Sequence, residues 1–386
     1  MQHMGILGGT FDPIHEGHLA MARQAIRELN LSRVLLVPTA KPSYRTPECG
    51  YRSRMEMCRL AAAGEEGIEV SGLGASSNMQ YPAELLSALH RQMPDTRFTF
   101  LLGADKLPTL PYWRDAEKLF RLCDFLCFPR AGVNAEDAAA EAREMGAVIR
   151  VSETICPPVS SAMIRGRTAR YEDAPGVPMP VLGYMAENGL YQPDELPKLR
   201  GMMNPHRFEH TLGVRREAVR LALRHHLPVQ KAARAGLLHD CAKGMPLQKM
   251  RRLAEENRLA CGEEVLSSAA LLHGPVGAYI AQTRFGVQDE DILNAIRNHT
   301  VGRPGMSPLE LAIFVADATE AGREDYPGLS EIRRLSDISL EAAALKSLQC
   351  TDEYLAGTGR AIFPLSREAM ADLSARLSPD AKKAML

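Results

Sequence analysis

Two histidines three residues apart, His15 and His18, follow a glycine-rich turn in the stretch GILGGTFDPIHEGHL, residues 5–19. The turn contains Gly8 and Gly9, and glycines at the end of a strand let a backbone approach a phosphate closely. Both histidines stand at the start of a predicted helix, where free backbone amides favour anions and two imidazoles can donate further hydrogen bonds. These residues together predict a cradle for nucleotide phosphates.

A dinucleotide-binding Rossmann site is the main alternative to this cradle, and the sequence fits it poorly. The glycine spacing is GxxGG instead of GxGxxG, and the second predicted strand ends in VPTAK, without an acidic residue for a ribose. A structural turn with incidental histidines is the other interpretation. It does not explain why two imidazoles stand at one helix start.

A second group of phosphate-binding candidates lies in PPVSSAMIRGR, residues 157–167. Ser160 and Ser161 stand at a predicted helix start, and Arg165 lies four residues after Ser161 on the same helix face. A hydroxyl, free helix amides and a guanidinium could then converge on one anion. The simpler alternative is that a serine here only caps the helix.

Four histidines and two aspartates in the second half have the residue types of a metal centre. They are His210, His239, Asp240, His273, His299 and Asp317. Asp317 stands inside the apolar run LAIFVADATE, where an acidic residue is costly unless it is paired or bound to metal. Each histidine alone is more simply a hydrogen-bonded core residue. The whole set favours a metal site, and imidazole with carboxylate suits Fe, Mn, Co or Zn.

The elements that must position the first group of residues are strands that alternate with helices. We predict strands at 4–7, 33–37, 67–70, 98–102, 124–128 and 148–151, and helices at 18–31, 52–63, 83–92, 116–122 and 135–145. This alternation predicts an α/β fold, a Rossmann-like parallel sheet with crossover helices. The glycine turn then lies at the carboxyl edge of the sheet, where such folds bind ligands.

The second half of the chain is predicted to be a separate all-α domain. Strand patterns nearly vanish after residue 201, and helical patterns follow one another. Pro193 and Pro197 mark a linker between the halves. We therefore expect domains at 1–192 and 202–386, joined by a linker at 193–201.

The length, net charge and cysteine content of the chain disfavour membrane proteins and nucleic-acid-binding proteins. A chain of 386 residues can bury two or three cores, and a net charge of −1 disfavours a broad nucleic-acid surface. No signal segment opens the chain and no apolar run is long enough for a membrane helix. Among the eight cysteines, Cys58, Cys123, Cys241 and Cys261 are expected to be buried free thiols, which favours a reducing cytoplasm. We expect a cytoplasmic protein that binds neither nucleic acid nor membranes, and homo-oligomers are compatible with the sequence.

Residues 4–191 resemble the bacterial nicotinate-nucleotide adenylyltransferase family. The motifs are GGTFDPIHEGH, LLGAD with a following tryptophan, VSSAMIR and VLGYMAENGLY, in the expected order. The resemblance implies that the phosphate of nicotinate mononucleotide attacks the α-phosphorus of ATP, giving the dinucleotide and pyrophosphate, with Mg²⁺ on the triphosphate. It implies catalytic roles for His15, His18 and Arg165, and ATP or substrate binding by Gly8, Gly9, Thr10, Phe11, Asp105, Trp113, Ser160 and Ser161. Trp113 would stack on the pyridine ring, unless it only packs in the core.

The same stretch departs from the family where the acceptor is bound. QYP stands where the family has Ser-Tyr-Thr, and its Pro82 has no backbone N–H for the nicotinate carboxylate. Gly72 stands in place of a glutamate, and KPSYR, which ends in Tyr44 and Arg45, stands in place of Pro-Pro-His-Lys. Nicotinamide mononucleotide is therefore an alternative acceptor.

Residues 202–326 resemble the HD phosphohydrolase superfamily, in the branch that cleaves diadenosine tetraphosphate symmetrically to two ADP. The motifs are RFEHTLGV, LLHDCAK, HGPVGAYIAQTRFGVQDEDILNAIRNHTVGRPGMS and FVADATE. The resemblance implies two divalent transition metals, with Fe as the first choice and Mn, Co or Zn as alternatives. It places His210, His239, Asp240 and Asp317 around one ion and His273 and His299 around a second, with Asp240 as a catalytic bridge.

Two cations near Asp240 are candidates for binding a substrate phosphate. Lys243 falls one turn after Asp240 and can face the same pocket, unless it is a solvated helix end. Arg207, one turn before His210, is a further candidate. We therefore expect two enzymes in one chain. The alternatives for the second half are hydrolysis of another nucleotide and a nucleotide sensor that does not turn over.

Overall fold

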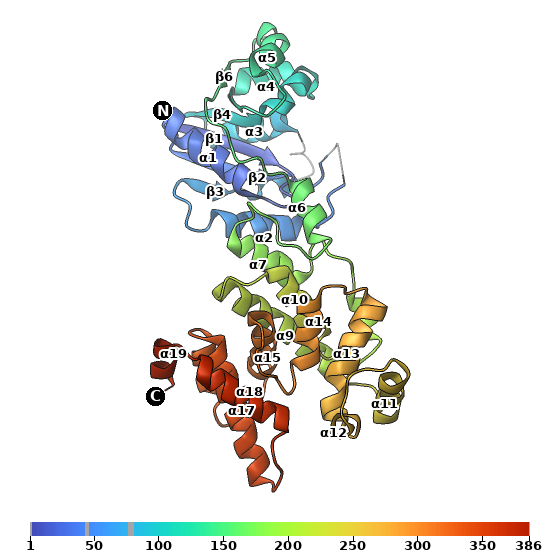
Figure 1. Cartoon of the computed structure of the whole chain (residues 1–386). Helices are drawn as coiled ribbons and strands as arrows, with labels where there is room; N and C mark the ends of the chain where they lie inside the picture. The colour runs from blue at the N-terminus through green and yellow to red at the C-terminus, as the bar shows by residue number, and fades with distance from the viewer. Residues whose placement is uncertain (1, 43–45, 76–80, 386) are drawn as a thin grey trace. The chain divides into compact units, whose positions relative to one another are not determined.

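The computed structural model describes residues 2–42, 46–75 and 81–385, which fold into two compact units (Figure 1). The first unit contains the chain up to Ala169 together with Ala174–Tyr184. The second contains Arg170–Asp173 and the chain from Met185 onward. The division falls inside the helix α7 (Met179–Asn188). The domain limits 1–192 and 202–386 stay a prediction.

A six-stranded parallel sheet forms the centre of the first unit, as predicted. Its strands are β1 (Gln2–Gly9), β2 (Arg33–Pro38), β3 (Ile68–Val70), β4 (Thr96–Gly103), β5 (Asp124–Phe128) and β6 (Ile149–Val151). They lie in the order β3-β2-β1-β4-β5-β6, so that β1 pairs with β2 and β4. The inner strands are mostly apolar because helices cover both faces of such a sheet, whereas the edge strands β3 and β6 each carry one exposed charged residue, Glu69 and Arg150.

The helices of the first unit follow the strands at close to the predicted positions. They are α1 (Glu16–Leu29), α2 (Tyr51–Ala62), α3 (Pro82–Gln92), α4 (Ala116–Leu122), α5 (Ala135–Glu144) and α6 (Ser161–Thr168), with short 3₁₀ helices η1 (Gly72–Ala75) and η2 (Ala104–Tyr112). The core lies between these helices and the sheet, with Leu86, Phe98 and Phe125 almost fully buried. We did not predict η2, because its two internal prolines argue against a helix.

The second unit is built from helices, and its described residues contain no strand, as predicted. The helices are α8 (Leu196–Arg200), α9 (Pro205–Arg224), α10 (Val229–Leu238), α11 (Leu247–Glu256), α12 (Glu263–Leu266), α13 (Ala269–Phe285), α14 (Glu290–Asn298), α15 (Pro308–Thr319), α16 (Leu329–Ser336), α17 (Leu340–Gly357), α18 (Pro364–Arg376) and α19 (Pro379–Ala384). The helix α15 is buried along nearly its whole length and packs against α9, α14 and α17. It therefore forms the centre of this unit.

Two expectations need correction. The predicted linker contains α8, whose Leu199 is buried; Pro197 lies in the first turn of this helix, where a missing N–H costs little. Cys261 is only partly buried, whereas Cys58, Cys123 and Cys241 are buried as expected. All eight cysteines are free thiols.

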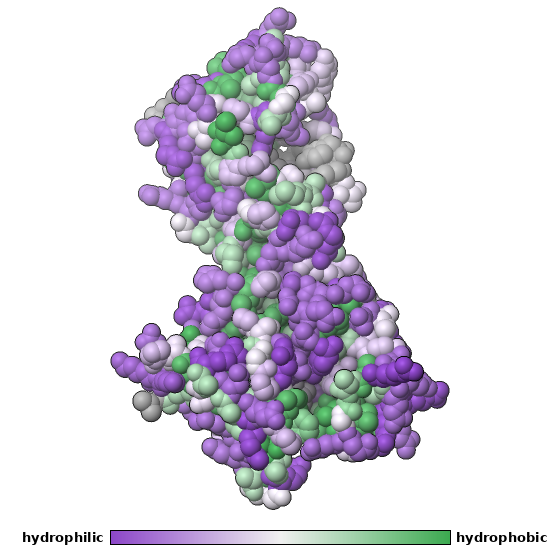
Figure 2. Space-filling view, in the orientation of Figure 1, coloured by the Kyte–Doolittle hydropathy of each residue, from purple (hydrophilic) through white to green (hydrophobic). Residues whose placement is uncertain are grey.

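Most of the visible surface is hydrophilic (Figure 2). Within the part of the chain that the structure describes, no helix combines the length and the apolar character that crossing a membrane requires.

Candidate active sites

The predicted phosphate cradle lies where β1 ends and α1 begins. His15 is the residue before α1, and its backbone N–H donates to Nδ1 of His18 at 3.3 Å. The two imidazole rings are stacked, with centroids 3.8 Å apart. Nδ1 of His15 is buried and has no hydrogen-bond partner within the part of the chain that the structure describes. The pair therefore presents ring nitrogens at a helix N-terminus, at the carboxyl edge of the sheet.

Both imidazoles of this pair are uncharged at neutral pH. Burial and the positive charge of Arg130 lower the pKa of His15 to about 4. Burial, His15 and Arg130 lower the pKa of His18 well below its ordinary value, although His18 is partly exposed where it lines a cavity. The two rings can therefore donate hydrogen bonds to a phosphate, but they bring no net charge to it.

The helix α6 holds the turn that leads to this pair. Ser160 caps the helix, because its Oγ accepts a hydrogen bond from a backbone N–H three residues later. Ser161 Oγ donates to the carbonyl of Pro13 at 2.8 Å, and Arg165 Nη1 donates to the carbonyl of Asp12 at 2.8 Å. Ser161 and Arg165 thus lie together at the glycine turn. Their contact with a phosphate stays a prediction.

A cavity of about 910 Å³ opens beside the glycine turn. Of the predicted binding residues, it is lined by Gly8, Gly9, Thr10, Phe11, His18, Asp105, Trp113 and Ser161, whereas His15, Ser160 and Arg165 lie outside its lining. The Trp113 ring is partly buried and packs edge-to-face on Phe100, with centroids 6.0 Å apart. Trp113 therefore both packs on the core and faces the cavity.

Sequence reasoning missed Arg130, which also lines this cavity. Its Nε lies 3.9 Å from Oδ1 of Asp105. The signal was available, because Arg130 follows the end of β5 by two residues and so lies at the edge of the sheet that binds ligands. Among the acceptor-site departures, Pro82 is the first residue of α3 and lines the cavity. Tyr44, Arg45 and the glutamine at 80 lie outside the described residues.

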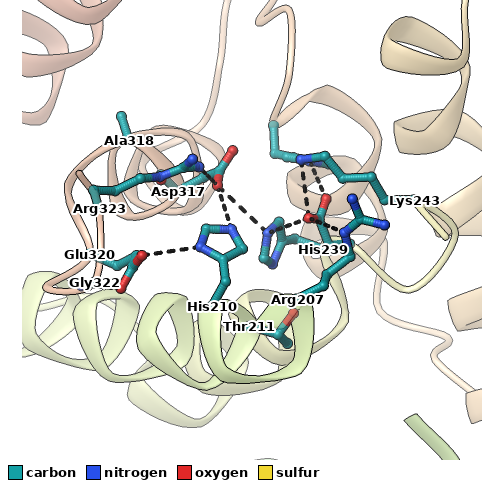
Figure 3. Close-up of polar contacts among 12 residues, drawn as sticks. Arg207, His210, Thr211, His239, Lys243, Asp317, Ala318, Glu320, Gly322 and Arg323 are labelled. Atoms are coloured by element: carbon teal, nitrogen blue, oxygen red, sulfur yellow. Dashed lines mark hydrogen bonds and ion pairs between the residues drawn. The ribbon is translucent and has the colours of Figure 1, made fainter. Parts of the chain in front are cut away.

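In the second unit, the six predicted metal ligands converge from distant parts of the sequence. Nε2 of His210 lies 3.0 Å from Oδ1 of Asp317, and Nε2 of His239 lies 3.8 Å from the same atom (Figure 3). Two sets of atoms lie close enough to hold an ion: His210, His239 and Asp317, and His239, Asp240 and His299. The six side chains come from α9, α13, α15 and the residues that follow α10 and α14.

Asp240 lies between these groups and turns one oxygen to each. Its Oδ1 lies 3.4 Å from Nε2 of His273 and 3.5 Å from Nε2 of His299. Its Oδ2 lies 3.6 Å from Nε2 of His239. Asp240 is 1% exposed, and among the described residues neither oxygen has a hydrogen-bond partner, although Lys243 forms an ion pair with Oδ2. A buried carboxylate in this situation is costly unless a cation neutralises it.

The contacts of the ring nitrogens indicate which nitrogen of each histidine carries the proton. Nδ1 of His239 and of His299 each contact a backbone carbonyl at 2.7 Å, and Nδ1 of His273 contacts one at 3.3 Å. A carbonyl only accepts hydrogen bonds, so Nδ1 carries the proton and Nε2 is left with its lone pair. The lone pairs of His273 and His299 then face each other at 3.0 Å. A divalent ion that accepts both lone pairs fits this arrangement.

The charge states of the aspartates fit the same role. Burial alone would raise the pKa of Asp240, but the positive charge of the Lys243 ammonium beside it helps to hold the pKa well below its usual range. Burial likewise opposes ionisation of Asp317, and His210, His239 and Arg323 outweigh it, so its pKa is also lowered. Burial lowers the pKa of His239 to about 4. Burial opposes a charge on His210, but Asp317 and Glu320 outweigh it and raise the pKa of His210, so this ring releases a proton more readily only when a metal displaces it. The site therefore offers charged carboxylates together with neutral imidazoles at His239 and His273, which metal binding requires.

Polar residues around this cluster include the two predicted cations and others that we did not predict. Lys243 Nζ lies 3.1 Å from Oδ2 of Asp240, and Arg207 Nε lies 4.0 Å from it (Figure 3). Both cations thus face the cluster, as expected. Glu320, which we missed, lies 3.2 Å from Nδ1 of His210 and orients that ring. Its position one turn after Asp317 in FVADATE was an available signal.

Comparisons with known proteins match each half of the chain to a family. Residues 6–167 match the cytidylyltransferase-like family and residues 207–322 match the HD domain family. A Mycoplasma genitalium protein named a probable nicotinate-nucleotide adenylyltransferase/Ap4A hydrolase is 29% identical over 90% of this chain and 97% of its own. The symmetrical bis(5'-nucleosyl)-tetraphosphatase of Bacillus subtilis is 39% identical over 43% of this chain and 88% of its own. A probable nicotinate-nucleotide adenylyltransferase of Gloeobacter violaceus is 38% identical over 49% of this chain and 96% of its own.

Proposed function

Because the chain belongs to the nicotinate-nucleotide adenylyltransferase family in its first half and to the HD-domain symmetrical bis(5'-nucleosyl)-tetraphosphatases in its second, we propose that it is a bifunctional enzyme. The first unit transfers the adenylyl group of ATP to nicotinate mononucleotide and releases pyrophosphate. The second unit hydrolyses diadenosine tetraphosphate to two ADP. This agrees with the expectation of two enzymes in one chain.

The observation that supports the first activity is the neutral His15–His18 pair at a helix N-terminus beside the cavity. The attacking group is already present on the acceptor phosphate, so the protein needs no covalent intermediate. Its task is to align the two nucleotides and to stabilise the charge that builds up on the phosphate oxygens. His18 lines the cavity and would donate a hydrogen bond there. Mg²⁺ would arrive with ATP.

The observation that supports the second activity is the cluster of buried ligand atoms, in which Nε2 of His239 and both oxygens of Asp240 have no hydrogen-bond partner among the described residues. Two divalent ions, when bound, clamp a phosphate and supply hydroxide at neutral pH. His210, His239 and Asp317 would hold one, His273 and His299 the other, and Asp240 both. Lys243, which is one-third exposed, would bind a substrate phosphate from the open side. Arg207 would assist it.

The proposal also includes the identity of the metal in the second unit and of the acceptor nucleotide in the first. The HD domain implies a divalent metal. We propose Fe, with Mn, Co or Zn as the alternatives. Nicotinamide mononucleotide stays the alternative acceptor, because Pro82 lines the cavity and cannot donate a backbone hydrogen bond. Eight free thiols support a reducing compartment such as the cytoplasm.

A product analysis tests the second activity against its rivals. Diadenosine tetraphosphate incubated with the metal-loaded protein should give ADP alone, and elemental analysis should find bound transition metal. Products of ATP and AMP would contradict symmetrical cleavage. Metal-free protein that binds the nucleotide without cleaving it would favour the sensor.

A further inference from the structure

Arg54, on α2, is a buried arginine with no acidic partner. It is 1% exposed, and all its hydrogen bonds go to backbone carbonyls. Nη1 donates to Thr10 at 2.5 Å and Thr39 at 2.9 Å, Nη2 to Ala40 at 3.1 Å, and Nε to Cys49 at 3.2 Å. No carboxylate of the residues described here forms an ion pair with it. Carbonyl oxygens solvate the guanidinium, but they leave its positive charge uncompensated.

The carbonyls that Arg54 contacts belong to segments around the phosphate cradle. Thr10 belongs to the glycine turn, and Thr39 and Ala40 belong to the loop after β2. Thr10 and Thr39 both line the 910 Å³ cavity. The charge of Arg54 therefore lies directly behind the cavity wall, and the same side chain fixes the two segments that form this wall.

The other cations of the cavity have acidic neighbours. Among the residues described as lining it, Lys106 lies 3.1 Å from a carboxylate oxygen of Asp105, and Arg130 and Arg114 lie 3.9 and 4.0 Å from their nearest carboxylates. The guanidinium of Arg165, at the edge of the turn, pairs with Glu48. The histidine pair is uncharged. Arg54 thus differs from all of these groups in having its full charge available to a ligand.

We propose that Arg54 is a positioning residue whose uncompensated charge, held behind the glycine turn by four backbone carbonyls, is neutralised by the polyphosphate of the bound nucleotide. The inference rests on the proposed function only in taking that nucleotide to be ATP. Arg54 does not touch the ligand. It fixes the wall, and its charge makes binding stronger with each added phosphate.

A ligand series separates this electrostatic role from a purely structural one. Binding of adenosine, AMP, ADP and ATP is measured by calorimetry in the absence of an acceptor, for the wild type, Arg54→Gln and Arg54→Lys. Arg59→Gln is the matched control, because Arg59 lies on the same helix and its side chain is 61% exposed. We expect Arg54→Gln to weaken ATP binding about tenfold or more and adenosine binding less than about twofold, since only charged ligands feel the lost charge. The control should match the wild type for every ligand.

Two results would overturn the inference. Equal weakening of adenosine and ATP would mean that Arg54 only maintains the fold, and unchanged ATP binding would mean that its charge is not used. If Arg54→Gln does not fold, Arg54→Lys provides the test. This variant should melt at a lower temperature but keep the wild-type ratio of ATP affinity to adenosine affinity. A ratio much smaller than that of the wild type would refute the charge role. The proposed function is tested separately, by assaying the wild type for dinucleotide synthesis. If the variants show the expected differences in nucleotide affinity but the wild type makes no dinucleotide, this inference is supported and the proposed function is contradicted.

Discussion

Replacing Asp240 by asparagine should separate metal binding from folding in the second unit. The amide keeps the size of the side chain but has no charge. It cannot act as an anionic bridge between two ions held by the imidazoles that lie 3.4 to 3.6 Å from the two carboxylate oxygens. Without metal, the buried wild-type carboxylate pairs with Lys243 at 3.1 Å. The lysine is one-third exposed, so Asp240→Asn leaves no fully buried charge without a partner and should change the stability of the metal-free unit little.

The size of the effect follows from linkage. A metal at about one hundred times its dissociation constant stabilises the folded wild type by about 2.7 kcal/mol. For a unit of this size, each kcal/mol shifts the melting temperature by about 2–4 °C, so metal should raise it by about 5–10 °C. Asp240→Asn should lose this rise and at least about a hundredfold of the hydrolysis rate. Differential scanning calorimetry with and without metal, together with an ADP assay, measures both effects.

Asp291→Asn is the control for this prediction, because Asp291 is 61% exposed and its contact with Lys231 is a surface ion pair of small energy. It should keep the metal-induced rise and the hydrolysis. A metal-loaded Asp240→Asn protein that hydrolyses diadenosine tetraphosphate at the wild-type rate would refute the assignment of Asp240 as a bridge. A metal-free variant much less stable than the wild type would refute the argument that Asp240→Asn leaves no fully buried charge without a partner.

Three further predictions concern the other residues of the two sites. His18→Ala should lower dinucleotide synthesis about a hundredfold, because it removes a hydrogen-bond donor to a phosphate, and an unchanged kcat would exclude that role. Selectivity for nicotinate over nicotinamide mononucleotide, measured as a ratio of kcat/KM, should be weak because Pro82 lacks an N–H, and a strong preference would show that another donor replaces it. The pKa of His15 is lowered to about 4, so acid protonates the unfolded chain first and the first unit should lose up to about 3 kcal/mol between pH 6.5 and 4. Melting temperatures across this range should fall less for His15→Gln than for the wild type, and equal slopes would contradict the burial argument.

Sequence patterns predicted the elements well wherever one physical signal dominated. The strands of the sheet are apolar runs bounded by turns, and all six are present. The helix α8 was not predicted, because Pro193 and Pro197 are typical of a linker. Pro197 nevertheless lies in the first turn of this helix. The helix η2 was missed for a related reason, since its prolines are compatible with 3₁₀ geometry next to the cavity.

The residues that carry chemistry were predicted better than those that support them. Histidines and aspartates in apolar helices stand out in a sequence, and the six predicted ligands lie together. Arg54 gives no such signal, because its partners are backbone carbonyls of segments five to forty-four residues away and no acidic residue marks it. Glu310 is similar: it is 1% exposed and accepts hydrogen bonds from Asn298 and Arg303, next to the ligand His299. Such contacts depend on how the segments pack together.

The central claim, two separate active sites in one chain, is tested most directly by one chromatographic measurement. The wild type, His18→Ala and Asp240→Asn are each incubated with ATP, nicotinate mononucleotide, diadenosine tetraphosphate and a divalent metal, and both products are quantified together. We expect the wild type to form nicotinate adenine dinucleotide and ADP, His18→Ala to lose only the dinucleotide, and Asp240→Asn to lose only the ADP. Loss of both products from either variant, or formation of neither by the wild type, would contradict the claim.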